Sequence, residues 1–102
     1  MLRTMTWWDS AGKQYQREVD LTEVDLVNGR ITFVETSVKN SATVRLRRTE
    51  SGMYHSHLSA GQTPQDWASY VGSVSALGTI LIGRWRRDDG AYGGGGKFEL
   101  PL

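Results

Sequence analysis

Two histidines separated by one residue are the first candidates for chemistry in this chain. His55 and His57 flank Ser56 in a segment that alternates like a β-strand, so both imidazoles share one face, about 7 Å apart at Cα. Such a pair could begin a metal site, but the next residues, Leu-Ser-Ala-Gly-Gln, bring no third ligand. Ser56 points to the opposite face, out of reach of either histidine. We therefore expect surface or cavity-wall histidines, with no metal site and no other cofactor.

Arginines gather in two strand-like segments, 45–48 and 84–87. By alternation, each segment presents two guanidinium groups on one face, namely Arg45 with Arg47 and Arg84 with Arg86. Strands on one side of a sheet would bring the four groups together to bind an anion or a nucleic acid, with Tyr92 or a tryptophan stacking on bases. The net charge of +1 and the pI near 8.1 are low for a dedicated nucleic-acid domain. The alternative is a solvated face paired with Glu18, Asp20 and Glu35.

Tryptophan is frequent, with four residues in 102, and two of them are adjacent. Neighbouring strand residues face opposite ways, so only one of Trp7 and Trp8 can enter a single core. The other must line a cavity, a ligand groove or an interface between copies. Together with Trp85 and Tyr92, these residues predict a binding module for a small apolar or aromatic ligand or a protein partner. A free sheet edge would also favour self-association into a homo-oligomer.

The glycine run Gly93–Gly96 before Lys97 resembles a phosphate loop only superficially. That motif needs Gly at 91 and Ser or Thr at 98, where this chain has Ala91 and Phe98. The run is expected to be a floppy hairpin loop, or alternatively a flap over a cavity with Tyr92 as its contact residue. No nucleophile motif identifies catalytic residues. The enzyme alternative would place a site near the two histidines and the 86–92 loop.

The length of 102 residues predicts one domain over residues 1–102 with a modest core. The chain has no cysteine, which excludes disulfide scaffolds, zinc–thiolate sites and cysteine catalysis. Its N-terminus has no uninterrupted apolar run of signal-peptide length, and no segment approaches the roughly 20 apolar residues that span a bilayer. These features lead us to expect a soluble, cytoplasmic protein.

Period-two alternation predicts a mainly β fold, an antiparallel sheet or barrel of about seven to eight short strands. Segments 13–21 and 43–48 alternate most clearly, and segment 79–86 is a strand that begins apolar on both faces, as a central strand does. Residues 64–77 are expected to contain a helix, because Thr63-Pro64 resembles a helix start and apolar residues follow at helical spacing. A shorter helix over 64–71 followed by a strand is the alternative, since glycine, serine and valine are frequent after Tyr70.

Two hairpin turns can be assigned in detail. Asn28-Gly29 predicts a two-residue type I′ turn that sets Leu26 opposite Ile31 and Val24 opposite Phe33, all facing the core. In the next hairpin, a three-residue loop ending at Gly52 would place Leu46 opposite Ser56 and turn Tyr54 toward the core.

Overall fold

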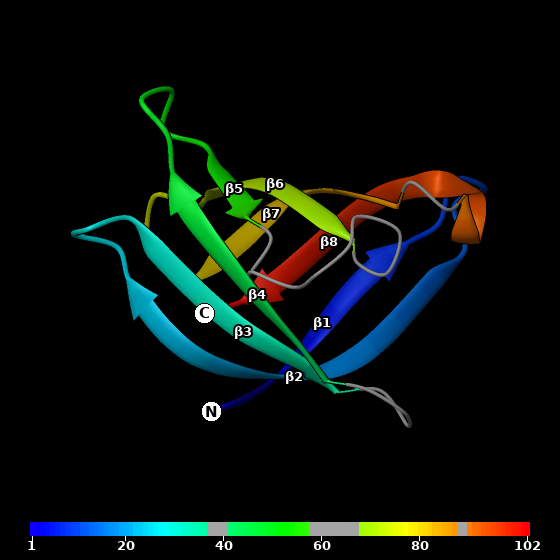
Figure 1. Ribbon diagram of the computed structural model, residues 1–102, viewed down its shortest axis with the longest axis horizontal. Helices are drawn as coiled ribbons and strands as arrows, with labels where there is room; N and C mark the ends of the chain where they lie inside the picture. The colour runs from blue at the N-terminus through cyan, green and yellow to red at the C-terminus, as the bar shows by residue number, and fades with distance from the viewer. Residues whose placement is uncertain (37–40, 58–67, 88–89) are drawn as a thin grey trace.

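The computed structural model describes residues 1–36, 41–57, 68–87 and 90–102, and their strands form one closed antiparallel barrel (Figure 1). The eight strands follow one another around the barrel in chain order, and β1 closes against β8 through the pairs Thr6–Glu99 and Trp7–Phe98. The strands are β1 (Leu2–Trp8), β2 (Gln14–Asp25), β3 (Arg30–Thr36), β4 (Ser41–Arg48), β5 (Tyr54–His57), β6 (Ser69–Val74), β7 (Ile80–Arg86) and β8 (Gly95–Pro101). The prediction of seven to eight short antiparallel strands is confirmed.

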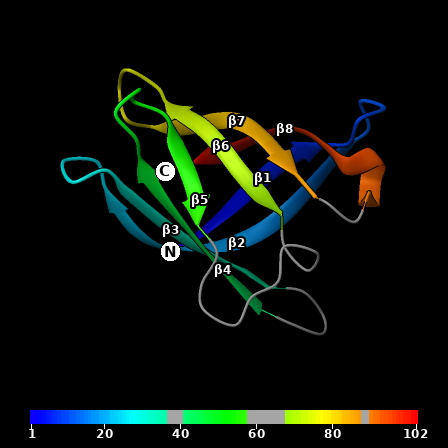
Figure 2. The ribbon, with the colours of Figure 1, turned by 45° about the horizontal axis from the view of Figure 1, so that its top comes forward.

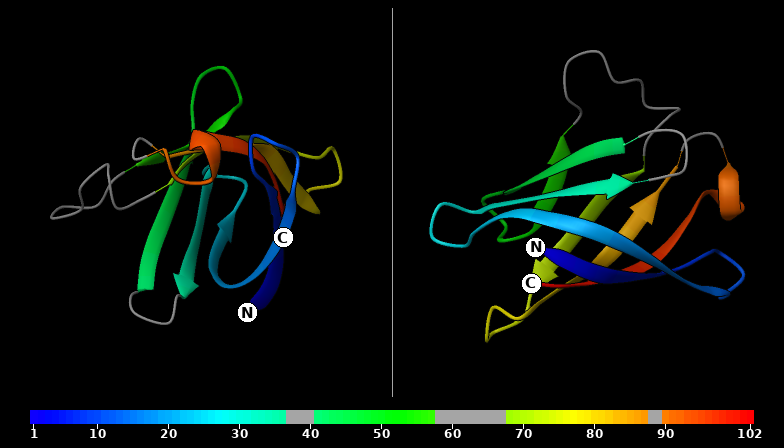
Figure 3. Two further views of the ribbon diagram at one scale, coloured as in Figure 1. Left: turned by 90° about the vertical axis from the view of Figure 1, so that its right-hand side faces the viewer. Right: turned by 90° about the horizontal axis from the view of Figure 1, so that it is seen from below.

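The barrel has two distinct ends. The turns 26–29, 49–53 and 75–79 lie at the same end as the two termini. The 9–13 turn and a 3₁₀ turn, η2 (Ala91–Gly94), lie at the other, which we call the distal end (Figure 3). In the part of the chain that the structure describes, no helix is long and apolar enough to cross a membrane.

Alternate residues of each strand fill the interior, as the period-two pattern requires. The strands curve around this shared space (Figure 2). Its most buried side chains come from six strands and are Met5, Val19, Ile31, Phe33, Leu46, Leu81, Phe98 and Leu100. Trp7 points inward and is 8% exposed, whereas Trp8 is half-buried on the outer face. The expected division between these two tryptophans is therefore observed.

The helix expected over 64–77 is wrong for its described part. Residues 64–67 lie outside the described residues, Ser69–Val74 form strand β6, and a turn follows at 76–77. β6 pairs with β7 from Ser69–Arg86 to Val74–Leu81. Val71, Gly72 and Val74 are poor helix formers, so the segment gains more from pairing with β7 as a strand than from forming a helix.

The β2–β3 turn differs from the predicted type I′ turn. Asp25 pairs with Arg30, so the loop has four residues, and only Gly29 has a positive φ, of 71°. The Asp25 carboxylate accepts hydrogen bonds from the Asn28 side chain at 2.8 Å and backbone at 3.0 Å, and these bonds lower its pKa. Val24 consequently pairs with Ile31, not Phe33, and is 42% exposed. A register shift beside Leu21 places the buried Phe33 opposite Leu21.

The β4–β5 hairpin matches its prediction. Thr49 and Met53 close a three-residue loop, and Gly52 has a φ of 87°. Leu46 lies opposite Ser56, and Tyr54 is 3% exposed. This register fixes which residues of β4 and β5 face outward.

Two glycines permit backbone contacts that hold the barrel together. A Cβ at Gly83 would lie 1.9 Å from the Val71 carbonyl oxygen, where β7 packs on β6. A Cβ at Gly96 would lie 2.0 Å from the Trp8 carbonyl oxygen, at the seam between β8 and β1. Neither position leaves room for a side chain.

Candidate functional site

Four aromatic side chains meet at the distal end of the barrel. Trp7 and Tyr15 pair across β1 and β2, and their rings stack with centroids 4.2 Å apart and planes 11° apart. Trp85 and Tyr92 meet Trp7 edge-on, at centroid distances of 5.2 and 4.9 Å. Three of the four predicted ligand-binding aromatic residues are thus in one cluster. Tyr15, which the ligand-binding prediction did not include, is the fourth member.

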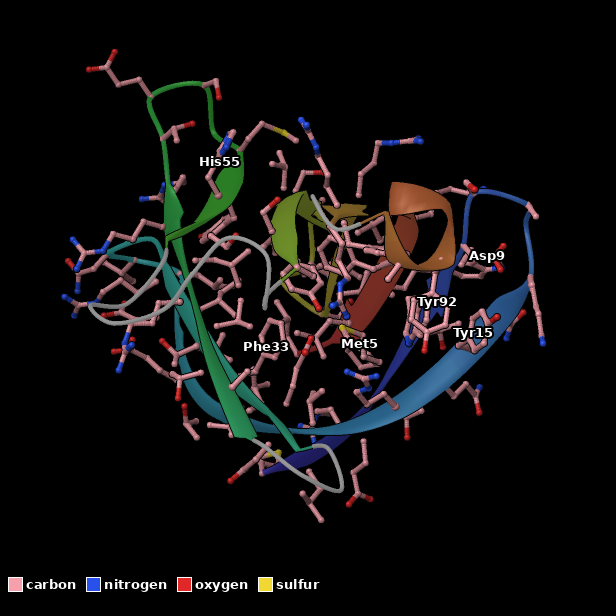
Figure 4. The ribbon with its side chains drawn as sticks, turned by 45° about the vertical axis from the view of Figure 1, so that its right-hand side comes forward. Met5, Asp9, Tyr15, Phe33, His55 and Tyr92 are labelled. Carbon is pink, nitrogen blue, oxygen red and sulfur yellow. The ribbon has the colours of Figure 1, made fainter. Side chains whose placement is uncertain are left out.

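The exposed part of the cluster is Tyr92, which is 48% exposed and has a φ of 54°. It is the one non-glycine residue with positive φ in the described chain. Figure 4 shows its ring beside Tyr15 and close to Asp9. The Tyr15 hydroxyl donates to the Asp9 carboxylate at 3.4 Å, so polar groups border the aromatic rings.

η2 is packed against the 9–13 turn. The Ser10 backbone N–H donates to the Tyr92 carbonyl at 3.3 Å, and a Cβ at Gly93 would lie 1.7 Å from the Ser10 hydroxyl oxygen. Gly93 and Gly94 thus belong to η2, and Gly95 and Gly96 begin β8. The glycines allow close backbone approach and left-handed φ at Gly90, Gly93 and Gly94.

Trp8 lies apart from the aromatic cluster. Its ring faces outward beneath the Lys97 ammonium group, 5.8 Å from the ring centroid. Its backbone carbonyl accepts a hydrogen bond of 2.7 Å from the Trp85 indole. Trp8 thus shares no ring contact with Trp7 and belongs to a different surface.

A charged group also lies inside the barrel. Tyr70 on β6 donates its hydroxyl hydrogen to one carboxylate oxygen of Glu35 on β3, and Arg17 on β2 donates to the other at 3.3 Å. Glu35 is 9% exposed and Tyr70 is 4% exposed. Burial, and then the charge of Glu35, raises the pKa of the Tyr70 hydroxyl well above its ordinary value. The phenol therefore stays protonated and donates at neutral pH.

These three residues were not predicted as a site. The signal was present at two of them, because alternation places Arg17 on the same face as Tyr15 and Val19. Glu35 likewise shares its face with Phe33. A charged residue at an inward-facing position indicates a partner across the interior, but sequence does not reveal that partner.

The four predicted anion-binding arginines all lie exposed on the outer face of the barrel, as Arg45 and Arg47 of β4 and Arg84 and Arg86 of β7. Two strands separate β4 from β7, so the pairs are about 14 Å apart around the barrel. Two of the three carboxylates proposed as their partners have other contacts: Asp20 pairs with the N-terminal amine at 2.6 Å, and Glu35 pairs with Arg17. An open hollow of about 730 Å³ adjoins Arg84, Arg86 and the 93–96 backbone.

The histidines do not join the distal cluster. His55 is half-buried on the outer face of β5 and pairs with Arg47, while the backbone of His57 pairs with Arg45. Figure 4 shows His55 well separated from Tyr92. Among the described residues, no three His, Asp or Glu side chains are grouped so that they could hold a metal ion.

The chain matches no protein-family model, no curated protein and no solved structure.

Proposed function

We propose that this protein is a small binding module that takes a planar aromatic ligand at the distal end of the barrel. The observation that carries the proposal is Tyr92, a half-exposed tyrosine with left-handed backbone that contacts the rings of Trp7 and Tyr15. Positive φ in a bulky residue costs on the order of 1 kcal/mol, and such strain is concentrated at binding and catalytic sites.

The chain could avoid this strain with glycine, which its neighbours Gly90, Gly93 and Gly94 use for the same left-handed conformation. A tyrosine at position 92 keeps an aromatic ring at the rim of the barrel instead. An aromatic ring adds stacking or edge-on contacts that glycine cannot make. The retained ring supports a role in recognition.

The groups around the cluster indicate which ligand fits. Tyr92, which is 48% exposed, presents ring surface for stacking. The Tyr15 ring is already stacked on Trp7 and has the Lys13 ammonium group 5.2 Å from its centroid. Asp9 accepts two backbone hydrogen bonds at 2.9 Å through one oxygen, while its other oxygen receives only the long bond from Tyr15 among the contacts of the described residues. That oxygen can accept a hydrogen bond from an O–H or N–H group of the ligand. The preferred ligand is therefore a flat ring system with an O–H or N–H donor.

Chemical-shift titration with 2-naphthol, which has a flat ring system and one hydroxyl, tests the proposal. We expect the largest shifts in the backbone amide signals of Trp7, Trp85 and Tyr92 and in the indole signals of the two tryptophans. Tyr92→Gly should weaken binding at least about tenfold, because it removes the ring. Its free energy of unfolding should stay within about 1 kcal/mol of wild type, because strain relief offsets the lost packing.

Two controls make the result interpretable. Tyr92→Phe keeps the ring and should bind 2-naphthol nearly as well as wild type. Leu77→Gly removes another exposed side chain, 88% exposed, at the opposite end of the barrel and should have no effect. Unchanged affinity in a folded Tyr92→Gly variant would contradict the proposed site.

A further inference from the structure

A continuous row of outward-facing side chains crosses six strands of the barrel. Successive strand pairings align Arg47 with His55, His55 with Val71, Val71 with Arg84, and Arg84 with Lys97. Lys97 then lies over the ring of Trp8 on β1. We call Arg47, His55, Val71, Arg84, Lys97 and Trp8 the cationic row. Directly paired residues share one face of a sheet, so these six side chains lie side by side on the outer surface.

The surface around the cationic row is strongly basic. Among the described residues of β4–β8, the outer face carries five exposed cations and one carboxylate, that of Glu99. The cations are Arg45, Arg47, Arg84, Arg86 and Lys97. Glu18 and Asp20 lie on the outer face of β2 instead. Among the described strand residues, positive charge is therefore concentrated on the outer face of β4–β8.

We infer that this face binds single-stranded nucleic acid, with the phosphate backbone along the cationic row and a base stacked on Trp8. The row follows the curved outer surface of the closed barrel across five strand spacings, a path of about 24 Å, so its cations are spread along an arc and not around one point. A flexible chain of phosphates can follow such an arc, whereas a single small anion cannot contact all of its cations. Single-strand-binding barrels use sites of about four or more nucleotides.

Two further features fit a nucleotide chain. The half-buried indole of Trp8 lies at the end of the row, and a base can stack on it when the flexible Lys97 side chain turns from the ring to a phosphate. The open hollow of about 730 Å³ borders Val71 and Arg84 of the row and the glycine run 93–96. The hollow is open to solvent and gives a nucleotide chain space beside the row.

Fluorescence anisotropy with a labelled oligothymidylate of about 12 nucleotides tests the inference. We expect a dissociation constant of roughly 1–100 μM and a slope of log K against log salt near −2, because about three phosphates meet Arg47, Arg84 and Lys97. The double substitution Arg47→Glu with Arg84→Glu should weaken binding at least about tenfold and reduce the slope to about −0.7.

Matched variants separate a specific surface from general charge. Arg3→Glu changes the net charge as much as Arg84→Glu, but Arg3 lies near the start of β1, away from the row. It should retain nearly full affinity. Trp8→Leu should weaken binding at least about fivefold with the salt slope unchanged, because stacking does not release counterions. Circular dichroism and thermal melts check that each variant is folded.

Three outcomes would overturn the inference. The first is an absence of binding at low salt. The second is an equal loss of affinity in Arg3→Glu and Arg84→Glu. The third is a folded Trp8→Leu variant that binds oligothymidylate like wild type. The arginines would then form a surface that binds any polyanion. None of these outcomes bears on 2-naphthol binding at the distal end, so this inference and the proposed function can fail separately.

Discussion

Tyr70 reaches across the interior of the barrel and donates its hydroxyl hydrogen to the carboxylate of Glu35. The two residues lie on β6 and β3, which are not neighbours in the sheet. Arg17 of β2 completes the group at 3.3 Å from the second carboxylate oxygen. A buried carboxylate is tolerated only when it is paired and hydrogen-bonded, so the three side chains depend on one another.

Tyr70→Phe should lower the free energy of unfolding by about 1.5–3 kcal/mol. The substitution keeps the ring, which packs edge-on against Phe33 and Phe98, but removes a hydrogen bond to a charged group. Urea unfolding followed by circular dichroism measures the change. Tyr92→Phe is the control and should change stability little, because this tyrosine is half-exposed. An equal midpoint for Tyr70→Phe and wild type would show that the hydroxyl contributes nothing.

The same bond predicts a loss of stability at alkaline pH. The folded protein raises the pKa of Tyr70 above 10.0, so it keeps this proton at a pH where the unfolded chain releases it. The contribution is complete below about pH 10 and is lost as pH rises through the folded-state pKa. Between these values the free energy of unfolding should fall by about 1.4 kcal/mol per pH unit more in wild type than in Tyr70→Phe. Parallel pH profiles of the two proteins would contradict this assignment.

Gly83→Ala should destabilise the barrel by about 3 kcal/mol or prevent folding. The added Cβ would lie 1.9 Å from the Val71 carbonyl oxygen, and backbone cannot move aside as a flexible side chain can. Gly52→Ala is the comparison, because its Cβ would meet nothing within 4 Å and only the strain of a φ of 87° remains. We expect that variant to lose about 1 kcal/mol. Thermal melts give the melting temperatures of both variants, and that of Gly83→Ala should be the lower. A lower value for Gly52→Ala would show that β6 and β7 move apart easily to make room for a Cβ.

Gly29→Val should also cost more than about 1 kcal/mol, for two reasons. A β-branched residue is strained at a φ of 71°, and its Cβ would lie 2.7 Å from the Cβ of Arg48. The Arg48 guanidinium holds the same turn through the carbonyls of Leu26 and Val27, at 2.7 and 3.2 Å. Gly12→Val has similar strain, with a φ of 87°, but no neighbour within 4 Å. Gly29→Val should therefore have the lower urea midpoint of the two.

The fold was predictable where apolar residues follow a strand pattern. The strand β7 follows from its apolar start at Ile80-Leu81-Ile82, and the β4–β5 hairpin follows from alternation and from Gly52. β6 was predicted only in part, as a strand after residue 71 in the alternative assignment, because Tyr70, Val71 and Val74 fit helical spacing as well as a strand. The choice depends on pairing with β7, a contact between segments that periodicity does not contain.

In the β2–β3 turn, a nearby side chain changes the strand register that Asn28-Gly29 predicts. Asn28-Gly29 alone predicts a two-residue loop, but the Asp25 carboxylate accepts hydrogen bonds from Asn28 and thereby closes a four-residue loop. An aspartate three residues before the asparagine was the available signal.

The candidate sites were predictable to different degrees. The aromatic cluster follows from inward-facing Trp7 and Trp85, although the contact with Tyr92 depends on how η2 packs. The outer position of the four arginines follows from alternation alone. Their alignment with His55 and Lys97 does not, because it requires the registers of five strands.

The closed barrel changes the reason to expect self-association. A free sheet edge was one argument for a second copy, but the described strands close upon themselves and leave no such edge. The remaining argument is the half-buried indole of Trp8 on the outer face. A homodimer with Trp8 as its contact therefore remains a prediction, and such a dimer would compete with nucleic acid for the same indole.

Serine substitutions of the two adjacent tryptophans should have different outcomes. Trp7→Ser removes a ring that is 8% exposed and contacts three other aromatic rings, so it should cost about 3–5 kcal/mol and unfold most of the protein. Trp8→Ser removes an outward ring, so the variant should remain folded and lose association. Circular dichroism reports folding, and sedimentation equilibrium reports mass. A wild-type protein that sediments as a monomer at high concentration would contradict the dimer, whereas similar unfolding of both variants would contradict the assignment of Trp8 to the surface.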